Sequence, residues 1–237
     1  MRKSNSKITS KTNFLEGQIL LFNKPVGWTS FDLVKKVRGI IKSAKQIKKI
    51  KVGHAGTLDP LADGLLILCT GKFTKKIQEL QKEKKVYTGE ITLGSTTPSY
   101  DKETKINQTF DISKITPDLI YEISKKFEGK IMQKPPIFSA LKREGKRLYK
   151  HARAGNDIEI KSREVEIKTF KITSIKMPKV TFEVVCSKGT YIRSLAHDFG
   201  RKLNSGAHLS SLRREMIGNF KLSESISIES FKEKLLM

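Results

Sequence analysis

The sequence predicts an α+β protein with a central mixed or largely antiparallel sheet flanked by helices. Strand-like and helix-like segments intermix along the 237 residues without a regular strand–helix–strand repeat, which argues against a doubly wound parallel sheet. No internal repeat is visible in the sequence. The hydrophobic fraction of 37% is sufficient for a core at this length. We therefore expect one large domain, or one domain with an insertion.

The first two elements are a buried strand and an amphipathic helix. GQILLFNKP (17–25) is an apolar run that leads into a loop, and this pattern is typical of a buried strand. FDLVKKVRGIIK (31–42) has helical periodicity, and Thr29 or Ser30 is placed to cap it. The expected buried face of this helix consists of Phe31, Val34, Val37 and Ile41.

The rest of the chain alternates between the two kinds of element. Thr116-Pro117 is a typical helix start, and Gly129 is the expected stop of the helix that follows. We expect strands over 64–71, 86–94, 165–175, 179–187 and 207–218, and helices over 116–129, 191–203 and 228–236.

Charge is the most informative property of the composition. The formal net charge of +23, with a pI near 10.0, indicates a polyanionic partner, either nucleic acid or an anionic surface. No apolar run approaches the ~20 residues of a spanning helix, which disfavours a membrane protein. Cys69 and Cys186 are expected to be buried thiols in a reducing compartment, so we expect a cytoplasmic protein. Eight basic residues and no acid lie between Lys35 and Lys51, which favours a phosphate-contacting surface over a merely solvated one.

Several chemistries lack support in the sequence. No GxSxG motif is present, and the four histidines match neither HExxH nor a Cys/His finger spacing. GxGxxG and Walker motifs are also absent. We therefore expect neither a metal nor a cofactor, and carboxylate chemistry beside a basic surface remains.

Asp59, in GHAGTLDP, is the carboxylate of greatest interest. Asp followed by Pro is a common helix start, so Asp59 has a respectable interpretation as a helix N-cap. The following LADGLLILC favours a strand, however, and Pro60 holds Asp59 in an extended conformation. An acid preset in a glycine-rich loop can act as a nucleophile if a cation keeps it ionised.

Three other residues have structural and functional interpretations of their own. His54 is either a loop histidine bonded to the backbone or a substrate contact. Tyr87 lies on an alternating strand, where aromatic residues are usually buried. Arg193 lies in an early turn of its helix and is expected near the edge of the core. None of these residues alone identifies a function.

Six sequence blocks in a fixed order together resemble the TruB family of tRNA pseudouridine synthases. The resemblance runs from about Gly17 to Arg214, and GHAGTLDPLA is the most specific part of it. The blocks are LLFNKPVGWTSFDLVKKVR, VGHAGTLDPLADGLLILCTGKFTK, KVYTGEITLGSTTPSYD, QKPPIFSALKREGKRLYKHARAG, CSKGTYIRSLAHDFGRKL and GAHLSSLRR.

The resemblance implies a pseudouridine-synthase fold and an isomerase that acts without cofactor or metal. A uridine in the T-loop of tRNA (position 55) would be flipped out, its N-glycosidic bond broken, and the base rejoined through carbon. Asp59 matches the catalytic acid of the family. Whether it adds to the base, attacks the ribose carbon or supports a glycal-like route stays open. The enzyme could also assist tRNA folding.

The resemblance also implies roles for residues around Asp59. Tyr87 would stack on the target base and could serve in proton transfer. Arg193 would pair with Asp59 and keep it ionised in a dry pocket. Leu212 would form an apolar wall against the uracil.

Further support residues and an RNA-binding element follow from the same matches. His54 would lie beside the extruded nucleotide, Lys24 would support the catalytic loop, and Asp101 would help to order the site. The basic excursion at about 130–156 matches a thumb-like element that grips the T-loop. The implied phosphate contacts, taken as a group, are Lys142, Arg143, Lys146, Arg147 and Arg153.

The chain departs from the family pattern at three places. Asp63 stands where the family usually has Thr, and if its side chain approaches that of Asp59, the pKa of Asp59 would rise unless Arg193 compensates. The loop STTPSYDKE, which contains Asp101, differs from the common form. Only 23 residues follow Arg214, too few for the PUA domain that many relatives carry.

The expected organisation is therefore a flexible basic tail (1–13), a catalytic domain (14–220) and a short C-terminal helix (221–237) without a PUA domain. We expect tRNA as the partner, no membrane, no obligate protein partner, and a monomer. Two rivals remain: the guide-RNA-dependent branch of the superfamily, and an RNA chaperone that remodels tRNA without modifying it.

Overall fold

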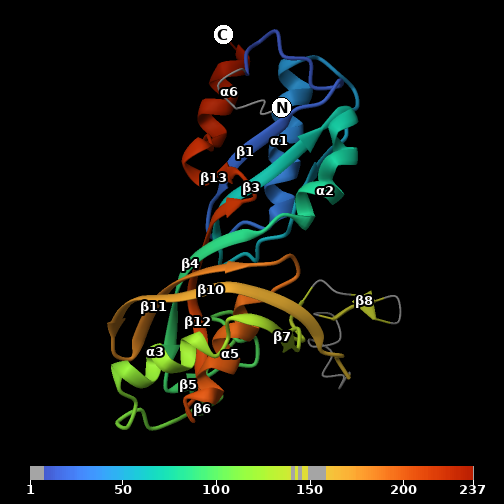
Figure 1. The fold of residues 1–237 in the computed structure, drawn as a ribbon. Coiled ribbons are helices and arrows are strands. Elements are labelled where there is room, and N and C mark those ends of the chain that lie inside the picture. Colours follow the sequence, from blue (N-terminus) through green and yellow to red (C-terminus); the bar gives the residue numbers. More distant parts are fainter. Residues whose placement is uncertain (1–7, 140–141, 144–145, 149–158, 237) are drawn as a thin grey trace. The chain divides into compact units, whose positions relative to one another are not determined.

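The computed structural model describes residues 8–139, 142–143, 146–148 and 159–236 (Figure 1). The chain divides into two compact units. The first unit contains residues 1–87 and 212–237, and the second contains residues 88–211. The strands β4 (Lys85–Leu93) and β12 (Ala207–Ile217) contribute residues to both units.

Nine of the described strands form a mixed, mostly antiparallel sheet, and the other four form two separate two-stranded sheets. Its strand order is β1 (Ile19–Lys24), β3 (Asp63–Thr70), β12, β4, β11 (Lys179–Cys186), β10 (Arg163–Lys176) and β7 (Gly129–Gln133). In addition, β2 (Val52–His54) pairs with β3, and β13 (Phe220–Lys221) pairs with β12. The pairing of β12 with β3 is parallel, whereas β1–β3, β2–β3, β10–β11 and β7–β10 are antiparallel. Helices flank these strands, so the predicted α+β class is confirmed.

The first unit is built from the two ends of the chain. Its strands β1 and β3 pair over six residues, and the buried face of this pair packs against α1 and α6. Its elements are β1 (Ile19–Lys24), α1 (Ser30–Ala44), β2 (Val52–His54), β3 (Asp63–Thr70), the 3₁₀ helix η2 (Gly71–Lys76), α2 (Ile77–Lys82), β13 (Phe220–Lys221), the 3₁₀ helix η3 (Leu222–Glu224) and α6 (Ile228–Leu236).

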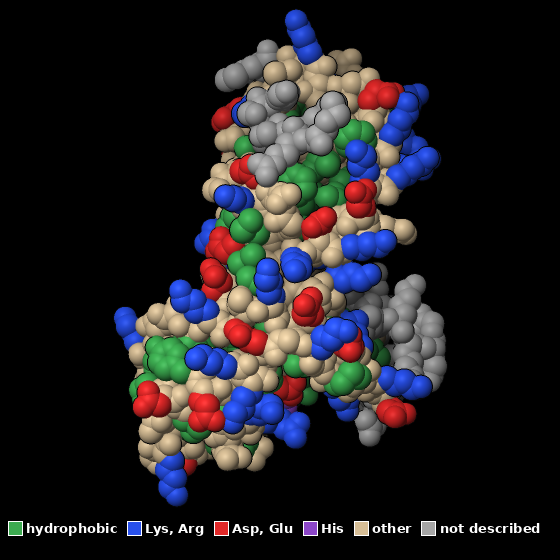
Figure 2. Space-filling model, in the orientation of Figure 1, with side chains coloured by type: hydrophobic (Ala, Val, Ile, Leu, Met, Phe, Trp, Pro, Cys, Tyr) green, Lys and Arg blue, Asp and Glu red, His purple; other side chains and the backbone are tan. Residues whose placement is uncertain are grey.

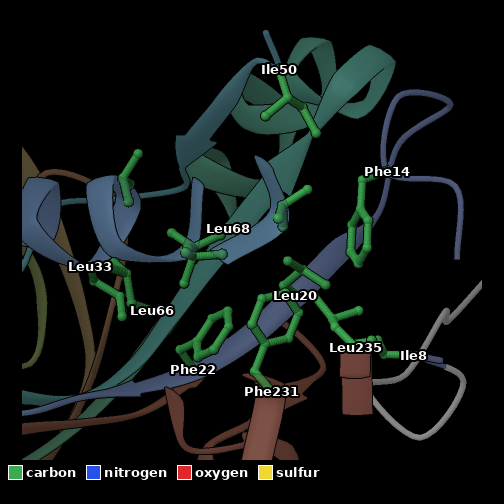
Figure 3. Close-up of a cluster of buried hydrophobic side chains, with 13 residues drawn as sticks. Ile8, Phe14, Leu20, Phe22, Leu33, Ile50, Leu66, Leu68, Phe231 and Leu235 are labelled. Atoms are coloured by element: carbon green, nitrogen blue, oxygen red, sulfur yellow. The ribbon is translucent and has the colours of Figure 1, made fainter. Parts of the chain in front are cut away.

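Aromatic and aliphatic side chains from both chain ends fill the core of this unit. Phe231 of α6 packs edge-to-face against Phe22 of β1, with ring centroids 5.3 Å apart (Figure 3). Leu20, Leu66 and Leu68 lie in the same cluster and are fully buried. The C-terminal helix is therefore an integral part of this core.

Helix α1 begins as predicted but buries a slightly different face. Thr29 is its N-cap, and Thr29 and Asp32 form a reciprocal capping box. The prediction that Phe31 lies on the buried face is wrong, because its side chain is 59% exposed. The buried residues of α1 are Ser30, Leu33, Val34, Val37 and Ile41.

The second unit packs two helices with antiparallel strands around an aromatic core. Phe127, Phe170, Phe182 and Phe199 form a chain of edge-to-face contacts, with centroids 5.4–6.2 Å apart. Besides parts of β4 and β12, its elements are β5 (Ser95–Thr96), β6 (Gln108–Thr109), α3 (Pro117–Lys125), β7 (Gly129–Gln133), β8 (Lys142–Arg143), β9 (Lys146–Arg147), β10 (Arg163–Lys176), β11 (Lys179–Cys186) and α5 (Ile192–Lys202).

Part of the predicted thumb-like excursion is described. β8 and β9 pair as a short antiparallel ladder that carries Lys142, Arg143, Lys146 and Arg147. Arg153 lies outside the described residues. Gly129 begins β7 with φ of +96°, and α3 ends four residues earlier, at Lys125, so Gly129 starts a strand instead of stopping the helix.

Two kinds of feature are absent from the described residues. No helix among them has the length and apolar character needed to span a bilayer. No group of three or more His, Cys, Asp or Glu side chains among them is arranged to hold a metal ion.

Candidate active site

Asp59 lies in a loop of the first unit that connects β2 to β3. The backbone N–H of Ala62 donates to the carbonyl of Asp59 at 3.1 Å, which closes a turn through Pro60 and Leu61. No helix begins at Pro60, since the chain passes from this turn directly into β3 at Asp63. The interpretation of Asp59 as a helix N-cap is therefore wrong.

The Asp59 loop is hydrogen-bonded to the connection between β1 and α1. The Ser30 hydroxyl accepts from the Leu58 N–H at 2.8 Å and donates to the Leu58 carbonyl at 3.1 Å. The Gly27 N–H donates to the Pro60 carbonyl at 2.8 Å. Residues on both sides of Asp59 are thus held by Gly27 of the connection and by Ser30 at the start of α1, which fixes the backbone that carries the carboxylate.

The buried side chain of Arg214, on β12, is hydrogen-bonded to the same loop. Its side chain is 1% exposed, and all three nitrogens of its guanidinium donate to backbone carbonyls. Nε donates to Leu65 at 2.8 Å, Nη2 to Gly56 at 3.0 Å and Nη1 to Thr57 at 3.4 Å. A buried cation with these partners ties the loop to β3 and places positive charge inside the unit.

The position of Arg214 requires a glycine opposite it. The parallel pairing of β12 with β3 sets Arg214 beside Gly64. Gly64 has φ of +103°, and a Cβ added there would lie 2.5 Å from the Arg214 carbonyl oxygen. Both the left-handed backbone and the close approach exclude a larger residue.

Lys24, at the end of β1, is fully buried near the carboxylates of this region. Its Nζ donates to the carbonyl of Trp28 at 2.7 Å and to that of Pro25 at 2.9 Å. Burial lowers the pKa of Lys24 to about 8, and the Asp63 and Asp59 carboxylates oppose this shift. Lys24 therefore holds the turn before α1 through hydrogen bonds, and its charge interacts with that of Asp59.

The carboxylate of Asp63 forms an ion pair with Arg213. Its Oδ2 lies 3.5 Å from Nη1 of Arg213, and this arginine also approaches Glu215 at 3.6 Å. Arg213 thus offsets part of the negative charge that Asp63 adds beside Asp59. The predicted effect of Asp63 on the pKa of Asp59 stays a prediction.

The remaining predicted residues of the first unit differ in exposure. His54 ends β2 and is partly buried. Burial and the charge of Arg214 lower its pKa, whereas a hydrogen bond with the Gly56 backbone acts in the opposite direction. An imidazole of this kind favours the neutral form at pH 7. Tyr87 on β4 is 9% exposed, and Leu212 on β12 is half-buried.

In the second unit, Arg193 and Asp101 form a buried ion pair. Arg193 lies in the first turn of α5, and its Nε is 3.5 Å from Oδ2 of Asp101, with side-chain exposures of 4% and 7%. The guanidinium also donates to the carbonyls of Phe138 at 2.8 Å and Ser99 at 3.2 Å. Asp101 is therefore an anion that holds Arg193 in place. Asp59 belongs to the first unit, and the predicted Arg193–Asp59 pair stays a prediction.

The loop that carries Asp101 is ordered by its own hydroxyl groups. Thr97 and Ser99 donate to the Asp101 carbonyl at 2.6 and 3.2 Å. Asp101 Oδ1 accepts from the Glu103 N–H at 2.9 Å. Tyr100, with φ of +63°, stacks on His197 of α5 with centroids 3.9 Å apart. These contacts give STTPSYDKE a defined structure despite its departure from the common family sequence.

The start of α5 is also hydrogen-bonded to the last residue of β7 and to the residue that follows it. The Gln133 side chain accepts from the Tyr191 N–H at 2.8 Å and donates to the Tyr191 carbonyl at 3.0 Å. Ser194 donates to the Lys134 carbonyl at 2.8 Å. Arg193 is thus positioned by hydrogen bonds on either side of it.

Sequence reasoning missed two residues of this site. Ser30 resembles an ordinary helix cap, and only the folded chain brings it to Leu58. Arg214 resembles a surface arginine in a basic chain, and its burial follows from the pairing of β12 with β3. A signal for Arg214 existed in the SLRR block, but it does not distinguish the buried arginine from the exposed Arg213.

Solved structures similar to this chain include two assemblies. One is titled "Crystal Structure of a Cbf5-Nop10-Gar1 Complex", with a TM-score of 0.69, 29% identity, and coverage of 98% of this chain and 60% of that one. The other is titled "Structure of H/ACA RNP bound to a substrate RNA containing 2'-deoxyuridine", with a TM-score of 0.66, 28% identity, and coverage of 93% and 53%. This chain thus spans little more than half the length of those solved chains.

Curated relatives match over nearly their full length. A protein of Flavobacterium johnsoniae named tRNA pseudouridine synthase B is 57% identical, over 94% of this chain and 97% of the relative. The protein of the same name from Phocaeicola vulgatus is 50% identical, over 94% and 95%.

Two family models match consecutive parts of the chain. Residues 42–192 match the model described as "TruB family pseudouridylate synthase (N terminal domain)". Residues 193–237 match "tRNA pseudouridylate synthase B C-terminal domain". With these matches and relatives of this identity, the chain belongs to the TruB family of pseudouridylate synthases.

Proposed function

We propose that this enzyme converts the uridine at position 55 in the T-loop of tRNA to pseudouridine, with Asp59 as the catalytic carboxylate. The observation that carries the proposal is the fixed loop around Asp59. Ser30, Gly27 and Arg214 bind the backbone on both sides of it, and Asp59 itself stays partly exposed. A preorganised carboxylate that a substrate can reach meets the geometric requirement for this chemistry.

The proposed reaction is a rearrangement that needs no external reactant. The bond between ribose C1′ and uracil N1 breaks, and a bond between C1′ and C5 forms. C5 loses its proton, and N1 gains one, so atoms and charge balance. Asp59 would act as nucleophile or would stabilise a glycal-like intermediate, and Tyr87 would assist the proton transfer.

Positive charge around Asp59 supports an ionised carboxylate. Lys24 lies within electrostatic reach of it, and the buried guanidinium of Arg214 lies behind the same loop. Nearby cations favour the charged form of a carboxylate. In this proposal Arg193, held by Asp101, adds a further cation when tRNA is bound. His54 and Leu212 would contact the extruded nucleotide.

The tRNA-binding surface is proposed to include two basic segments. The eight basic residues between Lys35 and Lys51 form no ion pair among the described residues, which leaves their charge available to phosphates. The β8–β9 hairpin carries four of the five basic residues assigned to the thumb. Lys and Arg side chains are also spread over the face shown in Figure 2.

Tritium release tests the proposed reaction. The protein is incubated with a T-arm minihelix tritiated at uracil C5, because formation of the new bond expels that tritium. We expect release by the wild type and none by Asp59→Asn. The control variant Asp118→Asn changes an exposed acid of the second unit and should retain release.

Binding of the minihelix by all three proteins without release from any would contradict the proposal. That outcome would instead support an RNA chaperone. Release by Asp59→Asn at the wild-type rate would contradict the assignment of Asp59.

A monomer in the cytoplasm completes the proposal. The polyanionic partner supports a compartment that contains tRNA, and the buried thiol of Cys69, which forms no disulfide among the described residues, is typical of a reducing one. Sedimentation of the purified protein and fractionation of cells test these two points.

A further inference from the structure

Three large apolar side chains are exposed close to the Asp59 loop. Val26 is 60% exposed, Phe31 is 59% exposed and Leu61 is 42% exposed. All three belong to the first unit. Single exposed apolar residues are ordinary on a protein surface, but a group of them is a candidate for binding.

Hydrogen bonds bring the segments that carry these residues together. The Gly27 N–H is hydrogen-bonded to the Pro60 carbonyl. Val26 directly precedes Gly27, and Leu61 directly follows Pro60. Ser30 is bonded twice to Leu58, and Phe31 follows Ser30 directly. Val26, Phe31 and Leu61 therefore belong to two backbone segments that these hydrogen bonds hold against each other. We refer to Val26, Phe31 and Leu61 as the apolar platform.

The residues of the apolar platform are not part of the buried core. Trp28, which lies between Val26 and Phe31, packs against the buried cluster that contains Leu33 and Phe22. Val26, Phe31 and Leu61 do not belong to that cluster or to the residues packed against it. The chain therefore partly buries Trp28 and leaves Val26 and Phe31 at the surface.

Charged side chains of both signs lie next to the platform. Asp32 is the adjacent acid, and its carboxylate accepts hydrogen bonds from the N–H and hydroxyl of Thr29 in the helix cap. Lys35 lies one turn after Phe31 on α1, is exposed, and forms no ion pair among the described residues. An apolar surface beside an unpaired cation matches a nucleotide, with a flat base and an anionic phosphate.

We propose that the apolar platform stacks on unpaired nucleobases of the substrate RNA next to the target uridine, and that Lys35 contacts a phosphate of the same strand. This inference rests on the proposed function. A base that is rearranged must leave its stack, and its neighbours in the loop then lose their own stacking partners. The platform supplies a replacement surface on the segments that fix Asp59, which couples recognition of the loop to the position of the carboxylate.

The size of the platform favours RNA over a protein partner. A stable protein–protein interface buries about 800 Å² on each side and contains about 20–30 residues. Three side chains fall well short of that, whereas one aromatic ring with two aliphatic neighbours suffices for one or two bases.

The test compares platform variants on two RNAs. Phe31→Ser/Leu61→Ser removes most of the platform, and Leu15→Ser/Leu236→Ser removes equally exposed apolar side chains elsewhere in the first unit. Affinity is measured for the T-arm minihelix and for the same RNA with abasic nucleotides flanking the target uridine. Circular dichroism verifies that each variant is folded.

We expect the platform variant to bind the intact minihelix roughly tenfold more weakly than the wild type, and the control variant to bind it equally well. On the abasic RNA, the wild type and the platform variant should bind alike, because the bases that stack are absent. Such non-additivity identifies the bases as the partners of the platform.

Three outcomes would overturn the inference. The platform variant could bind the intact minihelix as tightly as the wild type. Its affinity could be lower than that of the wild type by the same factor on both RNAs, which would exclude base stacking. It could instead convert a wild-type dimer to a monomer, which would assign the platform to a second copy of the chain. Failure of the proposed function is distinct, because the wild type would then release no tritium while these affinities remain measurable.

Discussion

At the scale of single residues, the site is defined by buried charges with identified partners. Arg214 binds three backbone carbonyls, and Lys24 binds two. In the second unit, Arg193 pairs with Asp101. Buried cations are costly unless acceptors surround them, and each of these side chains has carbonyl or carboxylate partners in the loops assigned to the site.

Replacement of Arg214 should be strongly destabilising. Arg214→Met leaves the carbonyls of Gly56, Thr57 and Leu65 without their donor, and we expect a loss of about 3 kcal/mol in the free energy of unfolding. Arg213→Met removes only partly exposed ion pairs, with Asp63 and Glu215, and should cost less than about 1 kcal/mol. Urea unfolding measures both values, and equal midpoints for the two variants would refute the structural role of Arg214.

At the scale of elements, α1 both builds the core and supports the Asp59 loop. Its buried face packs against β1 and β3, while its first residue, Ser30, bonds to Leu58. The N-cap, Thr29, stabilises the same helix through its capping box with Asp32. Substitution of the adjacent residues Thr29 and Ser30, one at a time, can therefore separate the effect of helix stability from the effect of loop position.

Ser30→Ala should lower kcat, whereas Thr29→Ala should not. Each variant is expected to lose about 1 kcal/mol of stability, one through the bonds to Leu58 and the other through the cap. Only Ser30→Ala frees the backbone that carries Asp59, and we expect kcat to fall about tenfold with little change in KM. Single-turnover kinetics at saturating minihelix provide the measurement. A matching loss of kcat in both variants would mean that helix stability alone matters.

At the scale of the whole molecule, net charge governs the encounter with tRNA. The excess of 47 Lys and Arg over 24 Asp and Glu residues leaves +23. The described ion pairs are mostly exposed and involve few of these cations. Most of the positive charge is thus available to phosphates, and binding should release condensed counterions.

Binding of tRNA should consequently weaken steeply with salt. Between about 50 and 200 mM monovalent salt we expect the affinity to fall by at least about tenfold. Filter binding with full-length tRNA at several salt concentrations gives the slope of log K against log salt concentration. Neutralising Lys48 and Lys49 as glutamines should reduce that slope. A nearly flat response would contradict the proposed role of the basic surfaces.

The sequence by itself determined most elements of this protein. The last helix has the bounds that its periodicity predicted, 228–236, and the strands β1, β3, β10 and β11 lie where apolar and alternating patterns predicted them. These elements were predictable because hydrophobic periodicity and capping residues act over a few neighbouring positions. The ordered blocks likewise indicated the family, and GHAGTLDPLA marked Asp59 as its candidate acid.

Only the tertiary structure decided which residues support that acid. Local pattern allowed Asp59 to cap a helix and put Phe31 in the core. The fold instead closes a turn after Asp59 and leaves Phe31 exposed, because the packing of α1 on β1 and β3 selects its buried face. Arg214 contacts residues about 150 positions earlier in the chain. Such contacts depend on strand pairing between distant segments, and no local pattern encodes them.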